Sequence, residues 1–220
     1  ADILEQADDF ESACKQLIRQ YITEHKRIIF NGNGYDDSWV KEAESRGLLN
    51  LKTTPDALPY FKTEENIALF ERQKVLSKEE VESRYEILMD EYEKQINIEA
   101  LTMLDIAKKD ILPAASKFSK ELTDTIANKK AIGIDLTYEL ETAKKISEYL
   151  TEAYQAMMTL ENDVKKLHEI DDFEKSAFYV RDFIIQDMAA LRKPCDELEV
   201  ITSNRDWPFP TYGKLLFGIQ

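Results

Sequence analysis

One long helical pattern, from Ser77 to Gly133, constrains the fold of this sequence more than any other feature. Apolar residues recur there at three- and four-residue spacing, with no glycine before Gly133 and with Pro113 as the one proline. The predicted inward stripe includes Val81, Tyr85, Leu88, Tyr92, Ile96, Ala100, Met103 and Ala107. Ser77 and Glu80 have the spacing of a capping box, which predicts a helix start, and Gly133 is the first expected stop. An unbroken helix over 78–131 would hold about 54 residues and measure roughly 80 Å. Pro113 is expected to bend it, because proline removes a backbone donor and presses on the preceding turn.

Two further long helices follow this pattern. Thr137 is predicted to cap the second helix, whose inward face forms a heptad-like series of Leu140, Ala143, Ile146, Leu150, Tyr154, Met157, Leu160, Val164 and Leu167. Asp171 and Glu174 resemble a capping box and open the third helix, in which Pro194 predicts a kink. The apolar stripe of the third helix consists of Phe178, Phe183, Met188, Leu191, Leu198 and Ile201.

Short connections join these helices, at residues 132–136 and 169–171. Such connections make successive helices antiparallel neighbours with coiled-coil-like packing. The predicted fold class is therefore mostly α. It is a long antiparallel helical bundle of three long helices, kinked near Pro113 and Pro194, preceded by an amphipathic helix and short helices with loops.

The N-terminal part is predicted to contain shorter elements. An amphipathic helix is expected from Ile3 to Ile29, ending at the Asn31–Gly34 turn, and a short helix should then end at Gly47. A helix starting at Thr54 should be limited to about one turn by Pro59. Another short helix should begin at Thr63.

Composition narrows the class of partner. The 220 residues carry a formal net charge of −14, which disfavours nucleic acid and anionic lipid as partners. No apolar run approaches the roughly 20 residues of a spanning helix, and the first residues lack the positive charge of a signal peptide. We therefore expect a cytoplasmic protein. Cys14 and Cys195 have no metal-binding or redox spacing and are interpreted as two buried thiols. The start at Ala1, close to a helical pattern, suggests part of a longer protein.

Residues able to do chemistry are few. His25 and His168 lack the spacing of a di-iron bundle site or of an HExxH zinc site, and are interpreted as surface or capping side chains. Gly32 and Gly34 favour a turn over a phosphate cradle, and no serine or cysteine has the context of a nucleophile. Paired acidic residues near helix starts are explained by the helix dipole. The sequence therefore predicts no catalytic, cofactor-binding or metal-binding residue.

The C-terminal tail is unusually apolar and is stiffened by prolines. It contains Trp207, Phe209, Tyr212, Leu215, Leu216 and Phe217, more apolar surface than a free tail tolerates in water. These residues are the candidates for an interface or a tail-docking site. Docking on the chain's own bundle and docking on another subunit both remain open at this stage.

Three segments resemble a known family. RIIFNGNGYDDSWVKEAESRGLLNLKTTPDAL, SRYEILMDEYEKQINIEALTMLDIAKKDILPAA and WPFPTYGKLLF are similar, in this order, to the C-terminal portion of type III glutamine synthetases. The resemblance implies that 1–92 are closing helices and loops of a catalytic domain, and that 93–220 form a helical-bundle extension with an aromatic C-terminal tail. It also implies an upstream catalytic domain and other subunits of the same protein as partners, in a dodecamer.

The activity implied by the resemblance is the ATP-dependent joining of ammonia to glutamate, with magnesium or manganese. The metal ligands, nucleotide loops and arginine motif of the family have no counterpart in these residues, so none is carried over. The predicted function is thus the structural and assembly part of the ligase, inactive as an isolated chain. Two alternatives remain: a free-standing helical protein–protein interaction module and, more weakly, a metalloenzyme bundle.

Overall fold

The structure is a computed structural model that describes residues 2–210 and 212–218, without the side chains of Asp2 and Tyr212. The described residues form helices and connecting loops, and no strand occurs among them, which confirms the predicted fold class. They divide into two compact units, Ala1–Lys52 and Thr53–Gln220. Within the described parts of the chain, no helix combines the length and the apolar content needed to cross a bilayer.

The first unit contains α1 (Asp2–Glu5), α2 (Phe10–Glu24), the 3-10 turn η1 (Lys26–Ile28) and α3 (Asp37–Ser45). The single amphipathic helix predicted over Ile3–Ile29 was wrong in its extent. Asp9 interrupts it, because its carboxylate accepts hydrogen bonds from the backbone N–H groups of Glu11 and Ser12 and so caps α2. No residue of α2 is buried. The apolar stripe of this helix is therefore largely exposed, and Cys14, which was interpreted as a buried thiol, is only half-buried.

The second unit opens with two short helices, α4 (Thr54–Phe61) and α5 (Glu64–Arg72). Thr63 caps α5 as predicted, accepting a hydrogen bond from the N–H of Asn66. Pro59 does not end α4 after one turn as expected, because it lies inside a helix of eight residues. This helix packs against α6 and α9, and these contacts compensate for the hydrogen bond that Pro59 cannot donate.

The long helical pattern forms α6 (Lys78–Ile106), the π-helical turn η2 (Ala107–Ile111) and α7 (Leu112–Ala131) without a break. The capping box is confirmed, since the Glu80 N–H lies 3.3 Å from Ser77 Oγ and the Ser77 N–H lies 2.7 Å from Glu80 Oε2. The predicted stop is confirmed at Gly133, whose φ of +71° suits glycine. The π turn directly precedes Pro113 and widens the helix where the proline ring would otherwise crowd a carbonyl.

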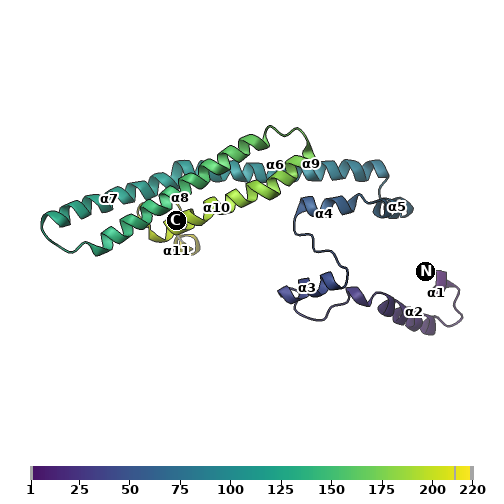
Figure 1. The fold of residues 1–220 in the computed structure, drawn as a ribbon. Helices are drawn as coiled ribbons and strands as arrows, with labels where there is room; N and C mark the ends of the chain where they lie inside the picture. The colour runs from purple at the N-terminus through teal and green to yellow at the C-terminus, as the bar shows by residue number, and fades with distance from the viewer. Residues whose placement is uncertain (1, 211, 219–220) are drawn as a thin grey trace. The chain divides into compact units, whose positions relative to one another are not determined.

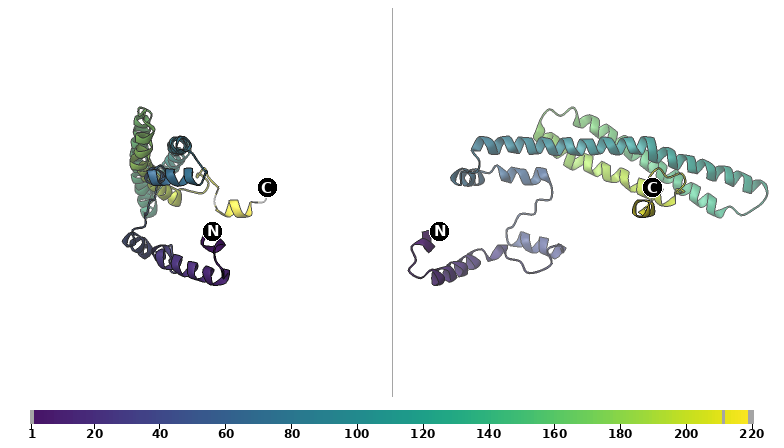
Figure 2. Two further views of the ribbon diagram at one scale, coloured as in Figure 1. Left: turned by 90° about the vertical axis from the view of Figure 1, so that its right-hand side faces the viewer. Right: turned by 180° about the vertical axis from the view of Figure 1, so that it is seen from behind.

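The remaining helices are α8 (Thr137–Leu167), α9 (Phe173–Tyr179), the π-helical turn η3 (Val180–Ile184), α10 (Ile185–Ile201) and α11 (Tyr212–Phe217). The α6–α7, α8 and α9–α10 segments run side by side, as Figures 1 and 2 show for the second unit. Successive segments run in opposite directions, as predicted, while α6–α7 and α9–α10, which also touch, run in the same direction. Pro194 is buried within α10, and the helix continues through it to Ile201. The irregular part of the α9–α10 segment is the π-helical turn η3, which precedes Pro194 in the sequence.

Two helix caps differ from the predicted ones. Thr137 does not cap α8 with its own side chain; instead the carboxylate of Asp135 accepts hydrogen bonds from the Thr137 N–H and hydroxyl. Asp172, rather than Asp171, caps α9 by accepting from the N–H of Lys175. Both corrections shift the cap by one or two residues, since neighbouring polar side chains compete for the same free N–H groups.

The core lies where the three long segments meet, and its register corrects the predicted stripes at several positions. Met89 is buried in α6 where Leu88 was expected, and Ala153 is buried in α8 where Tyr154 was expected. A small residue such as Ala153 permits close approach of neighbouring helices. In the third segment Ile184 is buried and Phe183 is 49% exposed. Both lie in the π turn η3, whose extra residue changes which position of that turn faces the core.

We predict that the α8 seam carries much of the stability of the bundle. Leu160 is fully buried, so Leu160→Ala should lower the free energy of unfolding by about 2–5 kcal/mol through the cavity that it leaves. Leu140, predicted from sequence to face inward, is 39% exposed, so Leu140→Ala should cost less than about 1 kcal/mol. Urea denaturation of both variants measures the difference. Equal losses for the two variants would contradict the assigned register.

Candidate functional site

Side chains that could ligate a metal ion do not gather into a site within residues 2–210 and 212–218. Among the residues that the structure describes, no three or more His, Cys, Asp and Glu side chains are arranged to hold a metal ion. His25 follows the end of α2, and His168 follows the end of α8 with its Nε2 3.0 Å from Asn97 Nδ2. These histidines are not accompanied by the ligands that a divalent cation needs.

The glycine-containing segment after η1 has the geometry of a packed turn. The Asn33 side chain accepts a hydrogen bond from the Tyr35 N–H at 3.1 Å. Phe30 stacks on Trp39 with ring centroids 3.9 Å apart. A Cβ atom added to Gly32 would lie 2.4 Å from a Phe30 ring carbon, so glycine is needed for this close approach. The turn therefore has a packing role in the first unit.

A partly exposed polar cluster joins α4 to the bundle. Glu174 of α9 accepts hydrogen bonds from Lys62 Nζ at 2.8 Å and from the Tyr85 hydroxyl at 2.6 Å, while the Lys62 ammonium lies 3.6 Å from the centre of the Tyr85 ring. These hydrogen bonds from Lys62 and Tyr85 lower the pKa of Glu174. Nearby, Arg181 pairs with Asp56 and lies over the Phe178 ring. Each carboxylate here already has a cationic partner, so the cluster holds helices together and offers no ligand site.

A second polar cluster contains two acidic residues on adjacent helices. Asp163 of α8 accepts hydrogen bonds from Lys166 Nζ at 2.5 Å and from the Tyr179 hydroxyl at 3.0 Å. Asp187 of α10 has a buried carboxylate oxygen without a hydrogen-bond partner. Burial, together with the adjacent carboxyl of Asp163, raises the pKa of Asp187 to about 6. This carboxyl therefore changes charge near neutral pH inside the bundle.

The aromatic tail divides into an anchored part and an exposed part. Trp207 packs against the bundle core, and the neighbouring Asp206 has a fully buried side chain paired with Lys117 Nζ at 2.9 Å. Phe209 is 37% exposed and lies edge-on to Trp207. In α11, Leu215, Leu216 and Phe217 are 65%, 71% and 80% exposed. The Tyr212 side chain lies outside the described part of the structure. The chain thus anchors its tail at Trp207 and leaves the following apolar residues uncovered.

An apolar groove lies between the α6–η2 segment and α10. It has a volume of about 460 Å³, and its lining includes Ile98, Met103, Ile106, Ile111, Met188 and Cys195, with Glu99, Arg192 and Asp196 among its charged residues. Burial raises the pKa of the Cys195 thiol to about 11. Sequence reasoning missed this groove, because it treated Met103 and Met188 simply as core. The sequence signal that could have indicated the groove is the combined width of the apolar stripes on α6–η2 and α10.

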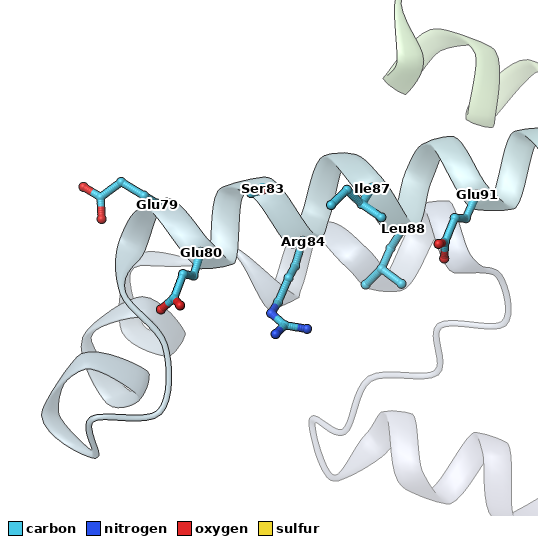
Figure 3. A pocket seen from close by; sticks show the side chains of 7 residues that line it. All are labelled: Glu79, Glu80, Ser83, Arg84, Ile87, Leu88 and Glu91. Carbon is cyan, nitrogen blue, oxygen red and sulfur yellow. The ribbon is translucent and has the colours of Figure 1, made fainter.

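A second hollow, of about 630 Å³, follows the first turns of α6. Its seven lining residues all belong to this one helix, so it is an open helix face rather than a closed pocket (Figure 3). In Figure 3, Arg84 and Leu88 point to the same side of the helix. Ile87 and Leu88, which are 52% and 41% exposed, give this face an apolar centre between charged residues.

Comparison with known proteins identifies the family that this chain resembles. The model of a family described as the glutamine synthetase C-terminal domain matches residues 13–130. A glutamine synthetase of Butyrivibrio fibrisolvens is 38% identical over 215 residues, which cover 97% of this chain and 31% of that protein. A type-3 glutamine synthetase of Dictyostelium discoideum is 32% identical over 217 residues, 94% of this chain and 29% of that protein. The chain thus spans less than a third of the length of these curated relatives.

The Asp187 carboxyl should make the stability of the bundle depend on pH. Because its folded-state pKa of about 6 is above the ordinary value of 3.8, the folded chain binds this proton more tightly than the unfolded chain. The resulting stabilisation is present below about pH 4 and is lost as the pH rises through about 6. Asp187→Asn should therefore raise the free energy of unfolding at pH 7.5 by roughly 1–3 kcal/mol and by much less at pH 4.

Denaturant unfolding of both proteins between pH 4 and pH 8 measures this difference. The control is Glu199→Gln, which removes an exposed carboxyl from the same helix. A stability difference between Asp187→Asn and the original chain that does not vary with pH would contradict the assignment.

Proposed function

The chain belongs to the family of glutamine synthetase C-terminal domains, and from that premise we propose that it is the non-catalytic C-terminal part of a type III glutamine synthetase. The family match over residues 13–130 carries this proposal, because it runs from the first unit into the α6–α7 segment of the bundle. The proposed parent joins ammonia to glutamate with ATP and magnesium or manganese. The residues that bind these groups belong, in this proposal, to other parts of the parent.

The chemistry of the described residues supports a structural role. Transfer of a phosphoryl group requires metal ions and cationic groups arranged around the γ-phosphate. In this chain, carboxylates such as Glu174, Asp163 and Asp206 are instead paired with lysine side chains of the bundle. Pairs of this kind connect helices of the bundle, which is consistent with a role in shaping the subunit and its assembly.

We propose that residues 1–92 close the catalytic domain of the parent and that 93–220 extend from it as the bundle. The exposed stripe of α2 supports the first part of this division, since Phe10, Ile18, Tyr21 and Ile22 are 52–63% exposed. The apolar centre of the α6 face, at Ile87 and Leu88, is a second surface suited to contact with the rest of the parent (Figure 3). Apolar helix faces of this kind mark protein contacts.

The partners proposed for the chain are the upstream catalytic domain and other subunits of the same protein, assembled as a dodecamer in the cytoplasm. The net charge of −14 supports this choice, because it disfavours nucleic acid and anionic membranes as partners.

The second candidate function is a free-standing helical interaction module, which the apolar groove beside α10 favours. The encoding gene distinguishes the two: several hundred codons in frame upstream of Ala1 support the ligase, and a start codon adjacent to Ala1 supports the module.

The isolated chain should make no glutamine derivative. We expect no γ-glutamyl hydroxamate from the purified 220-residue chain with glutamine, hydroxylamine, ADP, arsenate and manganese. The full-length parent, purified in the same way, is the positive control and should be active. Transfer by the isolated chain above the level of a heat-inactivated sample would overturn the structural assignment. Inactivity of the folded full-length parent would overturn the ligase assignment.

The α2 face should matter in the parent and hardly at all in the isolated chain. Ile18 and Ile22 are 58% and 53% exposed, so the double change Ile18→Asp with Ile22→Asp should alter the stability of the isolated chain by about 1 kcal/mol or less. In the parent the same change should lower the melting temperature by several degrees, because it would bury two charges at an apolar contact. Thermal melts of both proteins test this. Ile132→Asp, at a position 71% exposed, is the matched control. Unchanged melting of the parent would contradict the proposed contact.

A further inference from the structure

We propose that α11 of one chain docks into the apolar groove between α6–η2 and α10 of a second copy of this chain, and that the second copy returns the same contact. The residues of the tail and of the groove carry this inference, which does not depend on the ligase assignment. The interaction is a reciprocal exchange of C-terminal tails around a two-fold axis, the commonest symmetry of homodimers.

The tail has the properties of a docking segment. Its base is fixed, because Trp207 packs on the core and the buried Asp206 carboxylate is held by Lys117. Beyond that anchor, α11 presents Leu215, Leu216 and Phe217 at 65%, 71% and 80% exposure. Three adjacent large apolar side chains on an anchored segment are costly to leave in water, at about 25 cal/mol per Å² of apolar surface. A segment of this kind is stabilised by a complementary apolar surface.

The groove has the complementary properties. Its volume of about 460 Å³ is sufficient for several side chains and lies within the usual range for ligand pockets. Met103 and Met188 line it, and methionine side chains adapt to the shape of an incoming residue. Among its charged residues are Glu99 and Asp196 beside Arg192, an acidic balance. The α11 helix contains Lys214 and no acidic residue, so the signs of charge on the two surfaces are favourable.

The geometry favours a second copy as the source of the tail. Pro208 and Pro210 restrict φ in the connection, and α11 projects away from the long helices in the left view of Figure 2. The groove is lined by residues of α6, η2 and α10 and by none of α11. Each tail would cover on the order of 400 Å² with its three large side chains. Two tails and two grooves together would bury on the order of 1,600 Å², the size of a standard stable interface.

The first test is the mass of the chain in solution, measured by light scattering during gel filtration. The intact chain should be a dimer, and both removal of the residues after Pro210 and Ile98→Asp should make it monomeric. Ile98 is 60% exposed in the groove, so the substitution should leave the helical circular dichroism unchanged. The matched control Ile132→Asp, in the connection between α7 and α8, should remain dimeric. A monomeric intact chain, or a dimer that survives both changes, would overturn the proposal.

The second test traps the contact itself and distinguishes the two possible sources of the tail. Ile98 is 60% exposed in the groove, so each of the tail substitutions Leu215→Cys, Leu216→Cys and Phe217→Cys is combined with Ile98→Cys in a chain that also carries Cys14→Ser and Cys195→Ala. Mild oxidation should give a covalent dimer on a non-reducing gel for at least one of the three variants. The covalent dimer should be absent when Ile98 is retained in the same background. A disulfide formed within one chain, or no disulfide in any variant, would refute exchange between copies.

Discussion

The bundle depends on one constraint, which is that the helix from Lys78 to Ala131 must be covered along its length. A helix of that length exposes a long apolar stripe, and most of its stability in a protein comes from packing that stripe against other elements. The α8 and α9–α10 segments supply this surface, and buried alanines at 100, 107, 115 and 153 allow the backbones to approach closely. The polar clusters then lie at defined levels along the bundle. Lys62 and Glu174 fix α4 to it, while Lys117 and Asp206 fix the start of the tail.

The architecture was predictable because its signals are local. Ser77 with Glu80, Gly133, and the short connections that follow each specify a start, a stop or a reversal from a few neighbouring residues. The register of the buried faces was less predictable. A π turn adds one residue to a helical turn, and neither Ala107–Ile111 nor Val180–Ile184 has a composition that indicates one. For that reason the stripe that placed Phe183 inside was wrong within η3, where Ile184 is buried instead, while the predicted Leu191 and Leu198 of α10 are buried.

The polar clusters and the groove were beyond sequence reasoning for a different reason. Glu174 was interpreted as half of a capping box, but its partners Lys62 and Tyr85 are 112 and 89 residues away. Asp163 and Asp187 likewise come from adjacent helices, so their shared environment exists only after packing. The groove needs Met103 and Met188 on facing helices. The tail was recognisable from composition alone, whereas its division at Trp207 into an anchored and an exposed part was not.

The acidic balance of the chain also bears on how it assembles. With a net charge of −14, two copies repel each other over distances comparable to the screening length of the solution. A stable pair therefore needs a contact that is apolar and short-ranged, and that places little additional negative charge at the interface. Leu215, Leu216 and Phe217 satisfy this requirement, since the helix that carries them has no acidic residue. Because salt screens the repulsion and leaves apolar burial largely intact, association through this contact should strengthen as ionic strength rises, whereas association through surface ion pairs would weaken.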